Sequence, residues 1–440
     1  MRTVCSRGYS IIKDEISESE LFQIKDELTV TPYNPSFEQT KSFKLYLESK
    51  RKLYLPKFYG LAKFGPPELD KVHDLCAPAN INFDGSLRPE QQQVVDAYMD
   101  PKFNNGGIIN LYCGGGKTVI ALHIAARLKV KTMIIVHKEF LLNQWRERIE
   151  QFVTCGSVGL LKGKVCDLEG HDIVLASLQS LSMKEYPADA FDAFGLLIVD
   201  ECHHTSAEVF SRALAKVSCK HALGLSATLN RKDGLSRVFK WYLGDVVFKA
   251  AKRKDIVTVW VKTYYNSAHA YSGEHFIFAN KPNMSRMINN ICAFQERNEM
   301  LVETLKTLFE QEPARRVLLL SDRRSHLDKL HMMLKEIAVS SVKYYGGVKQ
   351  EVLAQDVQVI LATFAIASEG YDQQGLNTLV LASPKSDITQ SIGRILRERA
   401  EERTIEPLVI DIADDFSLFA RQASKRQQFY KSNSYNISNI

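Results

Sequence analysis

Several features that would place this chain in a specialised class of proteins are missing from its sequence. None of its eight cysteines forms a C-x-x-C pair, which argues against a disulfide framework or a zinc ribbon and favours a reducing compartment. No apolar run approaches the ~18 residues of a membrane span. The opening stretch MRTVCSRGYSIIKDE lacks the apolar core of a signal peptide. We therefore expect a soluble, intracellular protein with no membrane span.

A strong excess of one charge is also absent. The 57 Lys and Arg residues barely outnumber the 51 Asp and Glu residues, and the net charge of +6 permits a polyanionic partner without requiring one. Hydrophobic residues at 45% and charged residues at 25% are ordinary for a soluble globular protein. The length of 440 residues favours two or three domains.

From about residue 107 onward, short apolar runs alternate with longer helical patterns. The runs are continuously apolar, as strands buried on both faces should be. The first six are GIINLY, TMIIVH, DIVLAS, LLIVD, ALGLSA and VVFKA, and the second six are VTVWVK, RVLLLSD, SVKYYGG, VQVILATF, TLVLASP and EPLVIDI. This rhythm predicts two α/β domains of similar size, at 86–250 and 251–440, each with its own parallel sheet.

Residues 1–85 follow a different pattern. Ser17 and Glu20 form a capping box before an amphipathic helix, and FKLYLES alternates apolar with polar residues like a half-buried strand. The KRK that follows predicts a turn into a second strand, LYLP. We expect a small α+β domain here, in front of the two parallel-sheet domains.

Two basic segments each have two interpretations. Residues 41–64 hold seven basic residues against one acidic residue, with six aromatics interleaved. Such a hairpin suits nucleic-acid binding, and equally a scaffold whose aromatics belong to a core. The pattern at 419–432, FARQASKRQQFYKS, predicts a basic helix that either adds electrostatic grip or packs on the last domain.

The stretch LYCGGGKT, residues 111–118, has the chemistry of a phosphate site. Glycines let backbone N–H groups converge on an anion, lysine reaches its outer phosphates, and threonine ligates Mg²⁺. The strict P-loop pattern wants glycine where Leu111 stands, but Gly116, Lys117 and Thr118 fit it. The following helical pattern would present its N-terminus to the phosphates.

A second candidate motif, LLIVDECHH, ends a buried strand at 196–204. Asp200 is placed to hold Mg²⁺, and Glu201 to orient an attacking water, as in a Walker B strand. Cys202, His203 and His204 do not have the spacing of a closed tetrahedral zinc site.

The order of these motifs resembles the DExH group of superfamily 2 helicases. The Walker A lysine and DECH are followed by Ser226-Ala227-Thr228, then by ATFAIASEGYD (362–372), which is similar to motif V, and QSIGRILR (390–397), which matches Q-x-x-G-R-x-x-R. Within the superfamily the chain resembles the group of the xeroderma pigmentosum B, phage UvsW and poxvirus transcript-release helicases. The resemblance covers about residues 86–413 and implies two tandem RecA-like domains.

The resemblance, together with the chemistry of the side chains, assigns roles in an ATP site. Lys117 and Glu201 are expected to act in catalysis with Gln390, Arg394 and Arg397, which would serve as arginine fingers from the second domain. Thr118 and Asp200 would hold Mg²⁺. The remaining nucleotide-binding positions are Arg88, Gln91, Cys113, Gly114, Gly115, Gly116, Gly370 and Asp372. A salt-bridged helix, GRILRERAEER, is the alternative explanation for the two arginines.

The resemblance also implies a nucleic-acid track. His203 and Ser226, Ala227 and Thr228 would couple it to the ATP site. The expected backbone contacts are Lys138, Ser177, Gln179, Ser180, Ser321, Arg323 and Thr363. Short polar side chains suit phosphate contacts, although each could equally be an ordinary cap or turn residue.

These observations predict an ATP- and Mg²⁺-dependent DNA helicase or translocase, and family resemblance suggests 3′-to-5′ movement. An RNA helicase is the main alternative, because nothing in the motor motifs reads the 2′-hydroxyl. A P-loop transporter ATPase or kinase lacks support, since the motif VI arginines are present and second-substrate signatures are not. A viral origin, with a place in the host cytoplasm or virion, would suit the compact architecture. The sequence names no protein partner.

Overall fold

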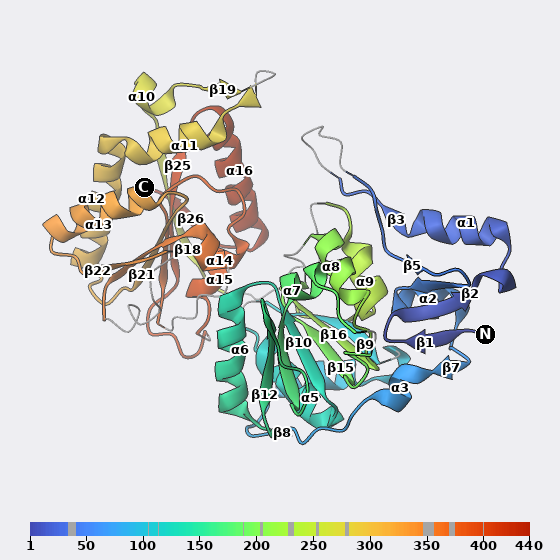
Figure 1. Cartoon of the computed structure of the whole chain (residues 1–440). Coiled ribbons are helices and arrows are strands. Elements are labelled where there is room, and N and C mark those ends of the chain that lie inside the picture. Colours follow the sequence, from blue (N-terminus) through green and yellow to red (C-terminus); the bar gives the residue numbers. More distant parts are fainter. Residues whose placement is uncertain are drawn as a thin grey trace. The chain divides into compact units, whose positions relative to one another are not determined.

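In the computed structural model the chain divides into two compact units, Met1–Ala251 and Lys252–Ile440 (Figure 1). The structure describes residues 1–33, 41–103, 105–112, 114–187, 189–202, 206–227, 233–251, 255–277, 281–345, 356–368, 375–398 and 400–440. Within these ranges no helix combines the length and the apolar character needed to cross a membrane.

In the first unit the described residues build an eight-stranded sheet in the order β13-β12-β14-β10-β15-β16-β9-β17. All neighbours are parallel except β13, which pairs antiparallel with β12. The strands are β9 (Gly106–Asn110), β10 (Thr132–Val136), β12 (Val158–Lys162), β13 (Val165–Cys166), β14 (Ile173–Ser177), β15 (Leu196–Val199), β16 (His221–Ser226) and β17 (Val246–Lys249). The six predicted strands are confirmed, and β12 and β13 were not predicted.

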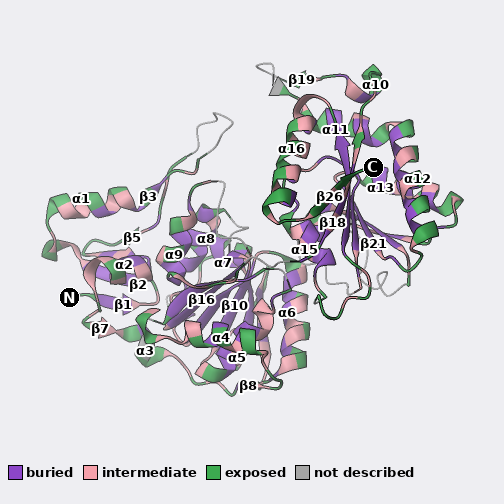
Figure 2. Cartoon of the chain, turned by 180° about the vertical axis from the view of Figure 1, so that it is seen from behind, coloured by how far each residue is buried: buried purple, intermediate pink, exposed green. Residues whose placement is uncertain are grey.

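Helices cover both faces of this sheet, and alternate strand residues enter two different cores. In β10, Ile134 packs with one core, which includes α4, α5 and α6, while Met133 and Ile135 face the core that includes α7, α8 and α9. Burial on both faces explains the uninterrupted apolar runs, and Figure 2 shows these strands as buried. The helices are α4 (Pro89–Tyr98), α5 (Lys117–Leu128), α6 (Glu139–Phe152), α7 (Leu178–Met183), α8 (Ala207–Leu214) and α9 (Ser236–Leu243).

The N-terminal residues form a separate small sheet in the order β5-β6-β2-β1-β7. Its parts are β1 (Thr3–Cys5), β2 (Gly8–Ile12), β5 (Leu47–Glu48), β6 (Lys52–Leu55) and β7 (Leu69–Asp70), with α1 (Glu18–Glu27), α2 (Lys57–Phe64) and α3 (Lys71–Leu75). Ser17 caps α1 by accepting from the Glu20 amide at 3.2 Å, as predicted. The β5–β6 hairpin is also confirmed.

The prediction of one alternating strand over FKLYLES is wrong. The segment is split into β4 (Phe43–Lys44), which pairs with β3 (Thr29–Val30), and β5. Leu45, between the two pieces, is buried, whereas Leu47 is 42% exposed. The chain changes partner strands at this point, so Phe43, Leu45 and Leu47 do not share one buried face.

The N-terminal region shares a hydrophobic core with the larger sheet of the first unit. Tyr59 is buried and meets Trp241 of α9 edge-on at 5.4 Å. Lys57 is enclosed and donates to the carbonyl oxygens of Cys219 (2.9 Å) and Lys220 (2.6 Å). Most aromatics of 41–64 therefore serve the core, and Lys57 is not part of any basic surface. The division into three domains, with 1–85 as a domain of its own, stays a prediction.

The second unit has a seven-stranded, fully parallel sheet among its described residues, in the order β22-β23-β21-β24-β25-β18-β26. The strands are β18 (Thr258–Tyr264), β21 (Val317–Ser321), β22 (Ser341–Tyr344), β23 (Val359–Thr363), β24 (Thr378–Leu381), β25 (Leu408–Asp414) and β26 (Asn436–Asn439). The principal helices are α11 (Met284–Ala293), α12 (Gln295–Gln311), α13 (Arg324–Glu336), α14 (Phe364–Ser368), α15 (Thr389–Ile395) and α16 (Ser417–Ser432). The six predicted strands are confirmed, and β26 was not predicted.

Shorter elements complete the fold. They are η1 (Lys13–Glu15), η2 (Pro101–Phe103), β8 (Asn82–Phe83) paired with β11 (Val153–Thr154), α10 (His269–Ser272), and β19 (Phe276–Ile277) paired with β20 (Lys281–Pro282).

Two buried arginines fasten helices to β25. From α12, Arg297 donates to both carboxylate oxygens of Asp414, at 2.6 and 2.9 Å. From α16, Arg426 donates to Asp411, with its closest contact at 2.7 Å. The predicted basic helix α16 therefore packs on the sheet through one of its own basic residues.

Candidate nucleotide site and nucleic-acid track

The glycine loop between β9 and α5 has the backbone that an anion site needs. Gly114 and Gly116 have φ angles of 82° and 80°, in the left-handed region that glycine enters without steric cost. A Cβ at Gly116 would lie 2.2 Å from Nε2 of Gln91, so this glycine also permits a close approach. Because α5 begins directly after Gly116, its first N–H groups and its positive dipole end face this loop.

Lys117 and Thr118 occupy the first turn of α5. Nζ of Lys117 donates to the carbonyl oxygen of Leu111 at 3.2 Å and lies 3.3 Å from Oε1 of Glu201. These contacts hold the ammonium group between the glycine loop and the end of β15. The structure thus brings the two predicted catalytic side chains of this unit together.

The acidic pair follows β15, whose neighbours are β10 and β16. Asp200 is buried, and Nε1 of Trp145 donates to its Oδ2 at 2.9 Å. Burial and the adjacent Glu201 carboxylate raise the pKa of Asp200 to about 6. Glu201 has a φ of 45°, a left-handed conformation that costs energy in a residue with a side chain. Such a turn is common at functional sites, and here it accompanies the contact with Lys117.

The oxygen donors at this position suit a hard divalent cation. Two adjacent carboxyl groups share one nearby ammonium, and Mg²⁺ takes carboxylate and hydroxyl oxygens in combination with phosphates. A cation beside Asp200 would favour its ionised form and oppose the effect of burial. The residues present therefore fit the predicted magnesium site.

Arg88 and Gln91 lie against the glycine loop, at the start of α4. The Arg88 amide donates to Oε1 of Gln91 at 3.0 Å, and Gln91 is buried with its amide nitrogen toward Gly116. A Cβ on Gly116 would also lie 3.4 Å from Nη2 of Arg88. The two predicted nucleotide-reading side chains are therefore neighbours of the phosphate loop.

Ser226 to Thr228 is the segment predicted to couple the ATP site to the track, and Ser226 is hydrogen-bonded to the residues just before the glycine loop. Ser226 ends β16 and is fully buried, and its carbonyl oxygen accepts from the Leu111 amide at 3.0 Å and from Nδ2 of Asn110 at 3.2 Å. Ala227 follows and is half-buried. Predicted site residues that lie outside the described residues are Cys113, His203, Thr228, Gly370 and Asp372.

In the second unit, α15 carries Gln390 and Arg394, and Arg397 lies just past its end. Arg394 is buried, and its Nε donates to the Ala367 carbonyl oxygen at 2.6 Å. The alternative of one salt-bridged helix over GRILRERAEER is wrong, because α15 ends at Ile395. Beyond it, Arg403 pairs with Asp255 at 2.8 Å.

The predicted track residues of the first unit follow adjacent parallel strands. Val136 of β10 and Ser177 of β14 are register partners, so Lys138 and α7 lie at the same edge of the sheet. Lys138 and Gln179 are exposed, and Ser177 is half-buried. The Ser180 hydroxyl accepts from the Gly163 amide at 2.9 Å. These four side chains are therefore placed where they could share one ligand.

The track residues of the second unit are less accessible. Ser321 is fully buried, with its Oγ 2.9 Å from Nδ1 of His326 and accepting from the Arg323 amide at 3.2 Å. Its hydroxyl is enclosed and hydrogen-bonded within the protein, and its role as a backbone contact stays a prediction. The Arg323 side chain donates to the carbonyl oxygen and hydroxyl of Ser285. Thr363, the register partner of Ser321, is half-buried at the end of β23.

Trp145 is a site residue that the sequence did not reveal. It lies on the buried side of α6, the helix that begins after Lys138, and contacts Asp200 directly. In the sequence it falls at helical spacing with Leu141, Leu142 and Ile149, which is typical of an ordinary core position. The sequence offered one signal of this role: a buried tryptophan needs a hydrogen-bond acceptor for its indole N–H.

Together, a glycine loop that opens a helix and an acidic pair that follows another parallel strand of the same sheet, with β16 between β15 and β9, are the features of a P-loop nucleotide site. Each unit has its own largely parallel sheet covered by helices, and the two together make a tandem of RecA-like domains. Residues 84–231 match the family model described as "Type III restriction enzyme, res subunit".

Similar proteins come from large viruses and phage. The chain is 34% identical over 98% of its length to "Putative ATP-dependent RNA helicase L396" of Acanthamoeba polyphaga mimivirus, of which 85% is covered. It is 25% identical to "Putative helicase 161L" of Invertebrate iridescent virus 6, with 80% of this chain and 82% of that protein covered. The solved structure of T4 UvsW aligns over 96% of both chains at 18% identity, with a TM-score of 0.38.

The chain belongs to the superfamily 2 helicases. It is an ATP-hydrolysing helicase enzyme, and the site built around Lys117 and Glu201 lies within the region that the family model matches.

Proposed function

We propose that this protein is a DNA helicase or translocase that moves 3′ to 5′ and uses Mg²⁺-bound ATP. The observation that carries the proposal is the convergence of Lys117, Asp200 and Glu201 at one glycine loop. A cation, a buried carboxylate and a partly exposed carboxylate at the N-terminus of a helix are what phosphoryl transfer to water requires.

Each side chain has one task in this proposal. Lys117 neutralises the outer phosphates, Thr118 and Asp200 hold the metal, and Glu201 orients the attacking water. Bound Mg²⁺ would stabilise the charge that develops on the phosphate oxygens. Arg394 and Arg397, supported by Gln390, stabilise the same charge, because a planar guanidinium suits it better than an ammonium does.

Trp145 and Ser226 give the site physical links to the track. The indole of Trp145 holds Asp200 from α6, and Lys138 is the N-cap residue of that helix. A shift of α6 on strand binding would therefore move a metal ligand. Ser226 ties the end of β16 to the start of the glycine loop. We assign Trp145 as a positioning residue that acts through Asp200.

RNA is the second candidate substrate. The preference for DNA comes from resemblance to the xeroderma pigmentosum B and UvsW group. The name of the mimivirus relative, which specifies an RNA helicase, favours the alternative. Phosphate contacts alone do not distinguish the two sugars.

The test is ATP turnover by the full chain with single-stranded DNA, duplex DNA, branched DNA and RNA of matched length. We expect DNA to stimulate turnover more than RNA does, and strand displacement to require ATP and a 3′ tail. Lys117→Ala is the control that ties the activity to this site. Stimulation by RNA alone would replace the DNA assignment, and equal turnover with and without every nucleic acid would refute the proposal.

A further inference from the structure

A recess lies between the N-terminal region and the α7–α8 side of the first unit. Its volume is about 340 Å³, within the range of small-molecule sites. Six side chains give it its character: Arg7, Lys44, Tyr46, Tyr186, Phe191 and Tyr242. None of these residues belongs to the nucleotide site.

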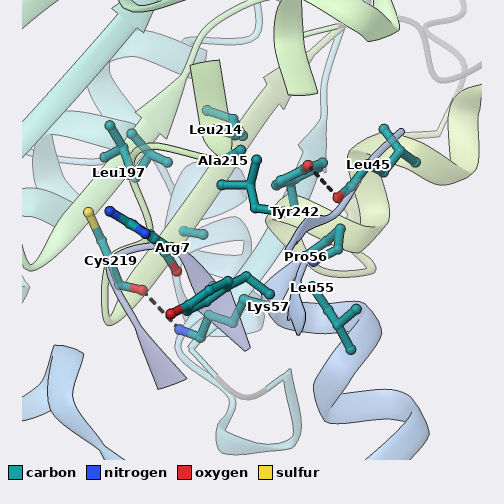
Figure 3. Close-up of a pocket in the computed structure, with 16 residues that line it drawn as sticks. Arg7, Leu45, Leu55, Pro56, Lys57, Leu197, Leu214, Ala215, Cys219 and Tyr242 are labelled. Carbon is teal, nitrogen blue, oxygen red and sulfur yellow. Dashed lines mark hydrogen bonds between the residues drawn. The ribbon is translucent and has the colours of Figure 1, made fainter. Parts of the chain in front are cut away.

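Hydrogen bonds fix the N-terminal region to the rest of the first unit beside this recess. A smaller cavity of about 10 Å³ adjoins it and shares Arg7, Leu45 and Tyr242 with it. Figure 3 shows the hydrogen bond from Lys57 to the Cys219 carbonyl and the one from Tyr242 to the Leu45 carbonyl. Because these bonds join the N-terminal region to the larger sheet, the recess is preformed by two packed elements.

The walls offer flat aromatic surface. Tyr46, from the N-terminal side of the lining, and Tyr186, from the opposite side, are half-buried and offer ring surface, while the buried Phe191 packs edge-to-face behind Tyr186 at 5.1 Å. Stacking on aromatic rings is the usual way in which proteins hold single-stranded bases without reading their sequence. The recess therefore suits a planar ring system.

The rim offers uncompensated positive charge. Of the four lining cations, Arg212 pairs with Glu208 at 2.7 Å and Lys216 with Glu185 at 3.3 Å. Arg7 and Lys44 lie over the rings of Tyr54 and Tyr46, at 5.7 and 5.6 Å, and are exposed. Neither has a carboxylate partner among the residues that the structure describes. Two cations beside aromatic surface favour a ligand that carries both a base and a phosphate.

The recess also adjoins the predicted track. Ser182 lines it, and it belongs to the same short helix, α7, as Gln179 and Ser180. A strand that contacts α7 would therefore pass beside a helix that lines the recess.

We propose that this recess binds one nucleotide of the nucleic-acid strand beyond α7, with the base between the aromatic walls and its phosphate at Arg7 and Lys44. The inference rests on the proposed helicase function and extends its binding track to the N-terminal region. An acidic peptide would use the same cations, but it would leave the aromatic walls without a planar partner.

The test compares two charge reversals in the full chain. Lys44→Glu alters the rim, and Lys71→Glu is the matched control, because α3 follows β7 at the opposite edge of the small sheet from β5. Binding of single strands of increasing length is followed by fluorescence anisotropy at several salt concentrations. Lys44→Glu should weaken binding of long strands only, and it should flatten the salt dependence by about 0.7 log units for each phosphate that the protein no longer neutralises. Tyr46→Leu should weaken binding of the same strands about tenfold.

The outcomes separate this inference from the proposed function. Turnover at saturating nucleic acid should be normal in all three variants, because the ATP site is untouched. Equal losses in Lys44→Glu and Lys71→Glu, or losses at every strand length, would overturn the recess while leaving the helicase intact. Binding of an acidic peptide in a Lys44-dependent manner, without any effect on strands, would make it a protein-docking site instead. Absence of any nucleic-acid stimulation in the unaltered protein would refute the function itself.

Discussion

One charged pair of the first unit and two buried ion pairs of the second unit are arranged in opposite ways. In the first unit, Nζ of Lys117 lies 3.3 Å from Oε1 of Glu201, and both side chains keep some access to solvent. In the second unit, Arg297 and Arg426 are enclosed, and each is bound to the carboxylate of an aspartate on β25 through more than one hydrogen bond.

The two ion pairs of the second unit are enclosed by the protein and carry further hydrogen bonds. The Asp411 cluster is completed by the Tyr430 hydroxyl at 2.9 Å, and the Asp414 cluster by the Tyr271 hydroxyl at 2.6 Å. These clusters join helices α12 and α16 to β25 through contacts within the protein. The nucleotide site differs, since Lys117 and Glu201 keep partial access to solvent, and burial beside the Glu201 carboxylate raises the pKa of Asp200.

The largest effect is expected at the nucleotide site. Lys117→Ala should abolish ATP turnover and weaken ATP binding, because it removes the ammonium group that lies between the glycine loop and Glu201. The melting temperature should change little, since the side chain is not a core element. Turnover and nucleotide binding measured side by side would check this, and normal turnover would contradict the assignment.

The next prediction tests whether Arg397, in the second unit, acts on the nucleotide as Lys117 and Glu201 are proposed to do. Arg397→Ala should lower the maximal rate by up to about 10³–10⁵-fold, with a smaller change in ATP affinity. Arg397→Lys is the control, because it keeps the charge and removes the planar fork. A near-normal rate in Arg397→Ala, or in Arg397→Lys, would remove Arg397 from the catalytic role.

A change at Arg426 tests whether its buried ion pair with Asp411 stabilises the fold. Arg426→Met leaves Asp411 buried without its cation and should lower the free energy of unfolding by about 3–5 kcal/mol. Arg421→Met, an exposed change on the same helix, should alter it by less than about 0.5 kcal/mol. Denaturant unfolding followed by circular dichroism measures both. If the two variants were equally stable, α16 would not be fastened through this cluster.

Trp145 is expected to give the smallest effect, because it acts through another residue. Trp145→Phe keeps an aromatic ring in the core, removes the N–H from which Asp200 accepts, and also loses part of the packed volume of the indole. We expect activity or magnesium affinity to fall by about 10–100-fold, as for other partners that orient metal ligands. The readout is the Mg²⁺ concentration that gives half-maximal turnover. A lower melting temperature with an unchanged magnesium dependence would show a packing role alone.

The strands were predictable because burial on both faces leaves a simple pattern. Runs such as TMIIVH are apolar almost throughout, and the parallel sheet explains why. The strands β12, β13 and β26 were missed because their residues alternate between buried and half-exposed, as in β12, or are mostly exposed, as in β13 and β26. Leu45 and Leu47 were assigned to one face because local alternation cannot show that the chain changes partner strands.

Motif residues were predictable where the chemistry is local, and not where it depends on packing. Gly116, Lys117 and Glu201 follow from spacing alone, and the structure brings them together. The burial of Ser321 depends on a histidine five residues away on α13. Which of the two interpretations of the basic helix holds at Arg426 could not be predicted, because its partner, Asp411, lies on a different element.

The central claim is that the glycine loop and the acidic pair of the first unit form an ATP hydrolysis site. Glu201→Gln tests it most directly, because the side chain keeps its size and loses only its charge. The account predicts ATP binding like that of the unaltered protein, since Lys117, Thr118 and Asp200 remain, and a fall in hydrolysis of about 10²–10⁴-fold, the usual contribution of a positioned acid–base group. Hydrolysis at a near-normal rate in this variant would contradict the claim.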